Sequence, residues 1–233
     1  MTVNCVWEHN GNDTLLYADR FAGAYARGES LEEAMAKMPR EIASFLRWRG
    51  EAVPEEISVE ITEEKESDLK ICDADSDVLF ESEKEPLTAE EYEILKALAL
   101  KSARDFLCLY HSVPDKNATA HPPRETFYGS VPRSAEEMYL HTKNVNAYYF
   151  GEIGVGADND GDIYACRKRG FDALETTPDY LSNAVVAGSY GEVWSLRKVL
   201  RRFIWHDRIH ARAMYRMAVK VFGADAVENP FCF

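Results

Sequence analysis

The sequence predicts an α+β protein. A small β-β-(β)-α-β domain at about residues 1–65 is expected to precede a four-helix bundle at about residues 87–233. Apolar residues alternate with polar ones in the first segment, recur at helical spacing in the last, and are outnumbered by charged residues in the acidic stretch 66–86. With 233 residues, 46% of them hydrophobic, the chain is long enough for two packed units.

A β-hairpin is expected at the N-terminus. Residues 2–7 alternate as a strand does, the Asn-Gly-Asn-Asp run at 10–13 is a turn signal, and residues 14–18 form a second strand. A short third strand is expected at 22–26. Residues 57–61, where Ile and Val alternate with polar residues, are expected to return to the same sheet.

A helix is predicted between these strands. Ser30 and Glu33 have the spacing of a capping box, and apolar residues then follow at helical period until the chain reaches Gly50. Pro39 falls inside this pattern and is expected to kink or interrupt the helix, because proline has no N–H to donate. The acidic stretch 63–85 is interpreted as one or two edge strands leading into a linker that ends at Pro86.

Four helices are predicted in the rest of the chain, at about 88–110, 134–150, 163–174 and 192–222. Capping pairs open the first two, since Thr and Ser are followed three residues later by Glu. A proline-rich loop of roughly twenty residues separates these two helices. A loop of that length is often functional. Four helices with long connections are typical of a bundle with crossover links.

The charge of the chain is uneven. Its net charge is −13, and residues 1–86 carry 21 acidic against 9 basic side chains. Such a surface repels a phosphate backbone, so nucleic acid is not expected as a partner. The five cysteines are scattered without a C-x-x-C pair, which favours free thiols in a reducing compartment. No signal peptide and no membrane span is expected, and a cytoplasmic location is the prediction.

The last predicted helix contains two histidines, His206 and His210, at a spacing of four. Side chains so placed lie on one face of a helix and can reach a single ion. The surrounding residues are apolar, so this face is expected to point into the bundle. Arg201, Arg208 and Arg212 lie opposite and are expected to face solvent, with ion pairs to the acidic N-terminal part as the alternative.

His141 lies on the apolar stripe of the helix predicted at 134–150. Three inward imidazoles on two helices suit a divalent ion (Zn, Ni or Fe) and leave a coordination position open. Each histidine alone is more often a core residue with one hydrogen-bond partner. Burying three unpaired would be costly, and one metal would satisfy all three. His121, in the proline-rich loop, is expected to be a surface residue, with part of a lid over the metal as the alternative.

Residues from about 87 to 222 resemble the DinB-like superfamily of metal-binding helical bundles. The resemblance lies in His141 of Tyr139-Leu140-His141 and in residues 194–210, WSLRKVLRRFIWHDRIH. It implies a four-helix bundle in which His141, His206 and His210 bind a divalent metal ion. Members of that superfamily include thiol-dependent transferases and an isomerase, so the resemblance does not fix one reaction.

The first 65 residues are similar to HicB-like domains. Residues 18–34, ADRFAGAYARGESLEEA, have a comparable short strand, capping box and helix. No DNA-binding element follows, so this resemblance implies a docking or dimerisation module, and a homodimer is expected.

Three functions remain open from the sequence. The first is a metal-dependent enzyme, a thiol-dependent transferase or a hydrolase acting on a small electrophile, although no acidic general base can be assigned and its catalytic residues stay unknown. The second is a non-catalytic binding protein stabilised by its metal. The third is a HicB-type antitoxin-related protein, which would require a small basic toxin. An open coordination position facing a cleft would favour the first.

Overall fold

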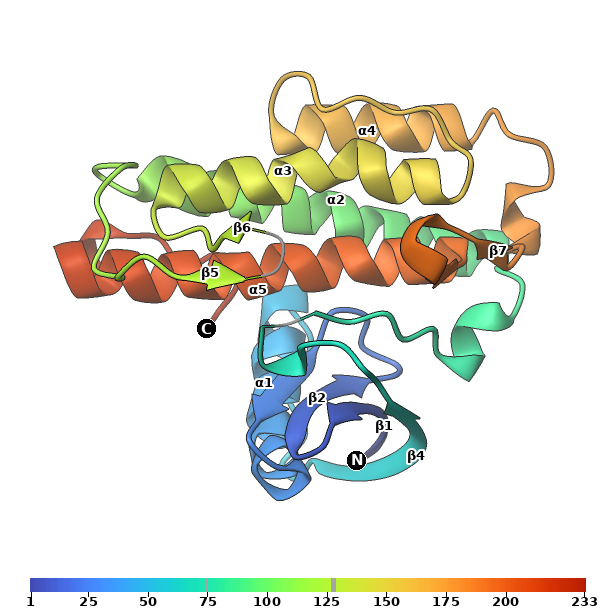
Figure 1. Ribbon diagram of the computed structural model, residues 1–233, viewed down its shortest axis with the longest axis horizontal. Coiled ribbons are helices and arrows are strands. Elements are labelled where there is room, and N and C mark those ends of the chain that lie inside the picture. Colours follow the sequence, from blue (N-terminus) through green and yellow to red (C-terminus); the bar gives the residue numbers. More distant parts are fainter. Residues whose placement is uncertain (74, 127–128) are drawn as a thin grey trace.

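The computed structural model describes residues 1–73, 75–126 and 129–233, and it shows an α+β protein (Figure 1). The helices are α1 (Leu31–Arg49), α2 (Ala89–Ser112), α3 (Ala135–Glu152), α4 (Ile163–Leu174) and α5 (Leu196–Phe222). The strands are β1 (Thr2–Asn10), β2 (Asp13–Ala18), β3 (Tyr25–Gly28), β4 (Ser58–Glu66), β5 (Glu125–Thr126), β6 (Gly129–Ser130), β7 (Val186–Ala187) and β8 (Val193–Trp194). Within these ranges no helix is long and apolar enough to cross a bilayer.

The N-terminal part forms the β-β-β-α-β unit that its sequence predicts. Its four-stranded sheet has the order β3-β2-β1-β4. The pairs β1–β2 and β2–β3 are antiparallel, whereas β1 and β4 are parallel. The parallel pair requires a long crossover, and α1 supplies it. Both faces of this sheet are covered, which is why β2 is buried along almost its whole length.

Helix α1 runs without a break from its cap to its end. The Ser30 side chain accepts a hydrogen bond from the Glu33 amide, and Gly50 ends the helix in a left-handed conformation (φ 75°). The expected interruption at Pro39 is wrong, because the helix continues through this residue. Burial of nine of its side chains, including Met38 and Ile42, stabilises the helix enough to tolerate the one lost backbone bond.

The acidic stretch 63–85, expected to form one or two edge strands, does so only at its start, because residues 63–66 belong to β4 at the edge of the sheet. The described residues from 67 to 85 form no further strand. The described residues there form two short 3-10 turns, Ile71–Asp73 and Glu81–Lys84, and extended chain. The apolar residues Ile71, Val78 and Phe80 instead pack onto the sheet face opposite α1, where they join the side chain of Trp205 from α5. Their alternation with acidic residues therefore reflects burial of single side chains and not strand pairing.

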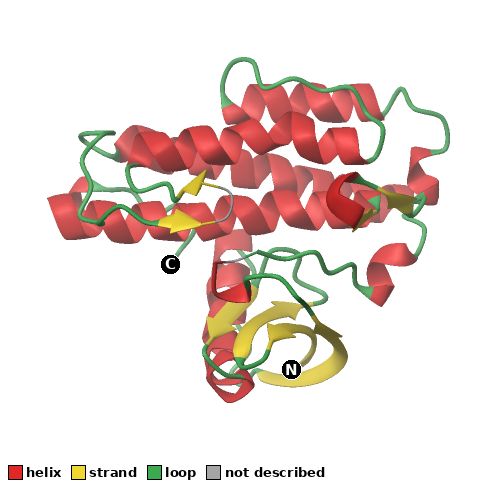
Figure 2. Ribbon diagram, in the orientation of Figure 1, coloured by secondary structure: helices red, strands yellow, loops and turns green. Residues whose placement is uncertain are grey.

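Helices α2 to α5 lie side by side, and α1 crosses beneath α5 (Figure 1). Figure 2 shows the resulting separation of a helical layer from the strands of the N-terminal unit. Helix α5 begins at Leu196 and not at the expected position 192, because the Ser195 side chain caps it and Val193–Trp194 pairs with Val186–Ala187. The other three bundle helices begin within a residue of the predicted positions.

The two parts share one continuous apolar core, which includes Val3, Phe45 and Phe203. The turn before β3 comes especially close to α5. A Cβ at Gly23 would lie 2.4 Å from Cγ2 of Ile204, and the positive φ of Gly23 (94°) also disfavours other residues there. The N-terminal unit is thus packed directly on the helix that carries His206 and His210.

The arginine face of α5 is buried, so the expectation that it faces solvent is wrong. Arg208 is 0% exposed and Arg201 3% exposed. Arg208 and Arg212 form ion pairs with Glu41 of α1, and Arg201 pairs with Glu83 of the acidic stretch. Two acidic residues of the N-terminal part therefore neutralise arginines of α5, as the alternative interpretation of these arginines predicted.

Candidate metal centre

Helix α5 positions two of the three predicted ligands. His206 and His210 are one turn apart, and their ring centroids lie 4.5 Å from each other. The Asp207 side chain between them points to the other side of the helix. There it accepts hydrogen bonds from Arg167 of α4 and from Ser102 of α2, all three side chains being buried. This network fixes the rotation of α5 and holds the histidine face toward α3.

Helix α3 brings His141 to the same point. Its ring centroid is 5.1 Å from that of His206 and 4.6 Å from that of His210. One nitrogen from each ring can be chosen so that all three atoms lie within 4.8 Å of one another. The structure thus brings together His141, His206 and His210. In the described part of the chain this is the only group of three or more His, Cys, Asp or Glu residues with such spacing.

The spacing of the nitrogens suits a shared metal ion. Nε2 of His141 and Nε2 of His206 are 3.3 Å apart. Two nitrogens bound to one tetrahedral zinc ion, each at a bond length of about 2.0–2.1 Å, are separated by about 3.3 Å. The same distance also permits a hydrogen bond between two neutral imidazoles, so the pair of rings alone is not diagnostic. The third ring makes the difference, because one metal ion can accept a lone pair from each of three imidazole nitrogens that lie this close together.

The environment keeps all three imidazoles neutral. His141 is exposed, so the expectation that all three imidazoles are buried is wrong for this residue, although the surrounding protein still desolvates its ring enough to lower its pKa. Burial, followed by the proximity of the other two histidines, holds the pKa of His206 well below its ordinary value. Burial and the proximity of His141 lower the pKa of His210 to about 3. Only a neutral imidazole has a free lone pair for a metal, so these shifts favour binding.

The surroundings of His206 differ from those of most metal-binding histidines. Such residues normally donate their second ring N–H to a carboxylate or carbonyl oxygen. Nδ1 of His206 is buried and has no hydrogen-bond partner in the structure. Its orientation is set instead by ring contacts, with Tyr149 at 6.0 Å and Trp205 at 6.3 Å between centroids.

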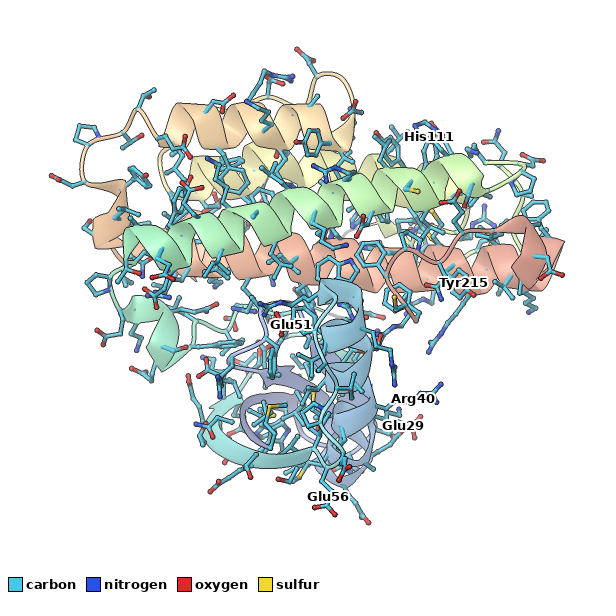
Figure 3. All side chains as sticks on the ribbon, turned by 180° about the vertical axis from the view of Figure 1, so that it is seen from behind. Glu29, Arg40, Glu51, Glu56, His111 and Tyr215 are labelled. Atoms are coloured by element: carbon cyan, nitrogen blue, oxygen red, sulfur yellow. The ribbon has the colours of Figure 1, made fainter. Side chains whose placement is uncertain are left out.

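The three histidines lie in the wall of a cleft of about 960 Å³ between the N-terminal unit and the bundle. Side chains from α1 and β3 line one side of it, those of α3 and α5 the other. Figure 3 shows Arg40 of α1 and Tyr215 of α5, two of the lining residues, on the same open side of the molecule. The proline-rich loop contributes Arg124, Val131 and Pro132. His121 of this loop is exposed, as expected for a surface residue, and it is not among the residues that line the cleft, so the alternative place in a lid is not supported.

Several residues of the cleft were not found from the sequence. Arg202 lies one turn before His206 on the same face of α5 and lines the cleft, as does Trp205. The spacing of four between Arg202, His206 and His210 was available as a signal. Arg40 and Tyr25 had no such signal, because only the packing of α1 and β3 against α5 brings them to the site.

The four cysteines whose side chains the structure describes contribute nothing to this centre. Cys5 and Cys166 are buried free thiols, and Cys108 and Cys232 are exposed free thiols. Burial raises the pKa of the Cys5 thiol to about 12. The hydrogen bond that the Cys108 thiol donates to Glu228 raises the pKa of Cys108 to about 11, so neither cysteine is a ready thiolate at neutral pH. The side chain of Cys72 lies outside the described part of the structure.

Comparison of the chain with protein-family models, with curated proteins and with solved structures gave no match. Any function must therefore be argued from the geometry above.

Proposed function

We propose that the protein is a divalent-metal-dependent enzyme that acts on a small substrate in the cleft, and that His141, His206 and His210 would hold its metal ion. The observation that carries this proposal is the position of the three imidazoles in the cleft wall, with no fourth protein ligand beside them among the described residues. Catalytic zinc sites have three protein ligands and one open position, whereas structural sites are closed by four.

The metal would supply a Lewis acid, lowering the pKa of a bound water or thiol so that a nucleophile exists at neutral pH. The chain itself supplies the surroundings. Tyr148 and Tyr149 of α3 line the cleft next to the histidines, and burial raises the pKa of both hydroxyls. They remain protonated at neutral pH and serve as hydrogen-bond donors to a substrate, not as bases.

The resemblance of residues 87–222 to DinB-like proteins supports the same function. It would make the reaction either a thiol-dependent transfer to, or the hydrolysis of, a small electrophile. No carboxylate of the described residues joins the histidine cluster. This favours transfer, because a metal-bound thiol loses its proton more readily than water and depends less on a general base.

The first experiment measures metal content. The protein, purified without a histidine tag, should contain or take up about one equivalent of zinc, nickel or iron per chain, as determined by mass spectrometry. Each of His141→Ala, His206→Ala and His210→Ala should reduce this content severely. His111→Ala is the matched control, because His111 is exposed, lies in the last turn of α2 (Figure 3) and does not line the cleft. Wild-type protein that takes up no metal would refute the proposal.

The second experiment tests the open position. Cobalt(II) should replace the native metal and give the visible spectrum of a tetrahedral site. Addition of azide or a small thiol should change that spectrum, because the added ligand enters the coordination sphere. A spectrum that does not respond to any added ligand would indicate a closed site and favour the alternative function, a binding protein with a structural metal.

A further inference from the structure

We infer that the cleft binds a small organic anion, with a carboxylate or phosphate group on Arg202 and the reactive end at the histidine cluster. This inference rests on the proposed metal centre and names the class of substrate that it takes. Three independent features of the cleft support it: its charge, its buried donors without partners, and the spacing of Arg202 from the histidines.

The charge of the cleft is opposite to that of the protein. The chain as a whole carries −13, yet among the described residues seven basic and three acidic side chains line the cleft. The basic residues are Arg27, Lys37, Arg40, Arg124, Arg202, Arg212 and Arg216, and the acidic ones are Glu41, Asp73 and Asp75. A divalent ion at the histidines would add further positive charge. A concave site of one sign concentrates small ions of the other.

Part of this charge is neutralised within the protein. Arg212 pairs with Glu41, Arg124 with Asp73, and Lys37 with Glu33. Arg40 of α1 and Arg216 of α5 are exposed, and neither has a carboxylate partner in the described structure. They lie on the two helices that border the cleft and would attract an anion from solvent.

Arg202 lies deeper and is 9% exposed. Its Nη1 donates to the carbonyl of Ser76 at 2.7 Å, and its Nη2 is 3.9 Å from Glu192. Glu192 is closer to Lys198, at 2.9 Å, which makes Lys198 its main partner. Among the described residues, the Nε of Arg202 has no hydrogen-bond partner. A buried guanidinium with an unused donor is costly, and an anion that accepts from it would remove that cost.

A second donor lies on the next turn of the same helix. The indole Nε1 of Trp205 is buried, lines the cleft and also has no acceptor. Arg202 lies against the Trp205 ring, at 5.0 Å from its centroid. Both groups can only donate at these atoms, so together they select an acceptor and favour an anion over a neutral or cationic group.

The spacing fits a short molecule. Arg202 precedes His206 by one helical turn, a rise of about 6 Å. A compound with an oxyanion at one end and its reactive group two to four atoms away can therefore contact Arg202 and the metal position together. The volume of about 960 Å³ leaves room for a second reactant.

The inference is tested by titration calorimetry on the full-length, metal-loaded protein and on the same protein after chelation. The probes are succinate, inorganic phosphate and succinamide, the last being the neutral counterpart of succinate. Succinate or phosphate should bind, and raised salt should weaken the binding because screening reduces the attraction. Whichever of the two binds more tightly identifies the anionic group. Succinamide should bind at least tenfold more weakly.

Variants locate the anion. Arg202→Gln should weaken binding of the preferred anion about tenfold or more, the usual effect of losing one hydrogen bond to a charged group. Since this buried substitution affects folding as well, the double variant R40Q/R216Q provides an independent test at exposed positions. It should weaken binding several-fold, while Arg47→Gln, an exposed arginine of α1 outside the cleft, should leave it unchanged.

The inference is overturned if metal-loaded wild type binds neither succinate nor phosphate, or if the affinity survives both Arg202→Gln and R40Q/R216Q. In those cases a normal metal content would leave the proposed function standing. If the protein binds no metal but still binds the anion through Arg202, the anion site exists and the proposed metal-dependent function is refuted.

Discussion

Glu41 of α1 and Arg208 of α5 form a buried ion pair with a separation of 2.8 Å, and the same carboxylate also pairs with Arg212. The side chains of Glu41 and Arg208 are 5% and 0% exposed. This cluster joins the N-terminal unit to the helix that carries two of the three candidate metal ligands. It therefore fixes the side of the cleft that α1 contributes.

Replacing Glu41 should destabilise the fold strongly. Glu41→Gln leaves Arg208 buried without a counter-ion, and the loss of one partner from a buried pair typically costs about 3–5 kcal/mol. Urea unfolding followed by circular dichroism measures the effect. Asp172→Asn is the control, because it breaks a pair with Lys168 in which both side chains are about half exposed, and should cost less than about 1 kcal/mol. Equal effects would show that the buried pair has no special importance.

Gly170 is required by the contact between α4 and α3. A Cβ at this position would lie 2.1 Å from Cε2 of Phe150. Gly170→Ala should therefore destabilise the protein by about 1–3 kcal/mol through overpacking. The double variant G170A/F150L should recover part of that loss, since it removes the clashing ring. Gly151→Ala is the matched control in α3, where nothing lies within 4 Å, and it should be neutral or slightly stabilising. Thermal denaturation distinguishes these outcomes.

Glu8 should make the stability of the protein depend on pH. It is 0% exposed, and burial raises its pKa, while bonds from Ser76 and from the Asp77 amide oppose the shift. A group whose pKa is higher in the folded state stabilises the fold below its unfolded value, near 4.5, and loses this contribution as pH rises through the folded value. Relative to Glu8→Gln, wild type should therefore become less stable from pH 4 to pH 8.

The readout for Glu8 is the difference in unfolding free energy between wild type and Glu8→Gln at several pH values. Glu60→Gln, at an exposed position of β4, controls for the loss of one negative charge. A difference that changes in the opposite direction would show that the hydrogen bonds to Glu8 outweigh its burial.

Metal binding should persist at acidic pH. The pKa values of His141, His206 and His210 are all lowered, that of His210 to about 3, so protons compete poorly for these rings below the ordinary value of 6.5. The zinc affinity, measured by competition with a chelator, should change little between pH 7.5 and pH 6. A hexahistidine peptide, whose imidazoles titrate near 6.5, should lose affinity over the same range. A parallel loss in the protein would contradict the prediction.

The local elements could be predicted because their causes are local. The pairs Thr88–Glu91 and Ser134–Glu137 form the expected capping boxes. The helix predicted at 163–174 has those bounds in the structure. In each case the interacting groups are within four residues, so the sequence pattern records the contact directly. The face shared by His206 and His210 follows from helix geometry in the same way.

The errors in prediction came from long-range contacts. The sequence pattern predicts that Arg201 and Arg208 face solvent, but both are buried. Their partners Glu83 and Glu41 are 118 and 167 residues away in the chain, so no local pattern indicates these ion pairs. The apolar residues between 69 and 80 are interpreted from the sequence as parts of edge strands. In the structure Ile71 and Phe80 instead pack beside Trp205, which is distant in the sequence. Neither contact leaves a periodic signal in the sequence.

The sequence by itself determined the five helices, the strands of the N-terminal sheet and the placement of His206 and His210 on one face, since these depend on backbone geometry and on neighbouring side chains. Tertiary structure decided how closely His141 approaches the other two histidines, that a cleft opens beside them, and that Arg202 and Trp205 keep donors without acceptors there among the described residues. Those features arise where α1, α3 and α5 pack together, and packing between distant segments depends on the burial of their side chains against one another, which no single segment encodes.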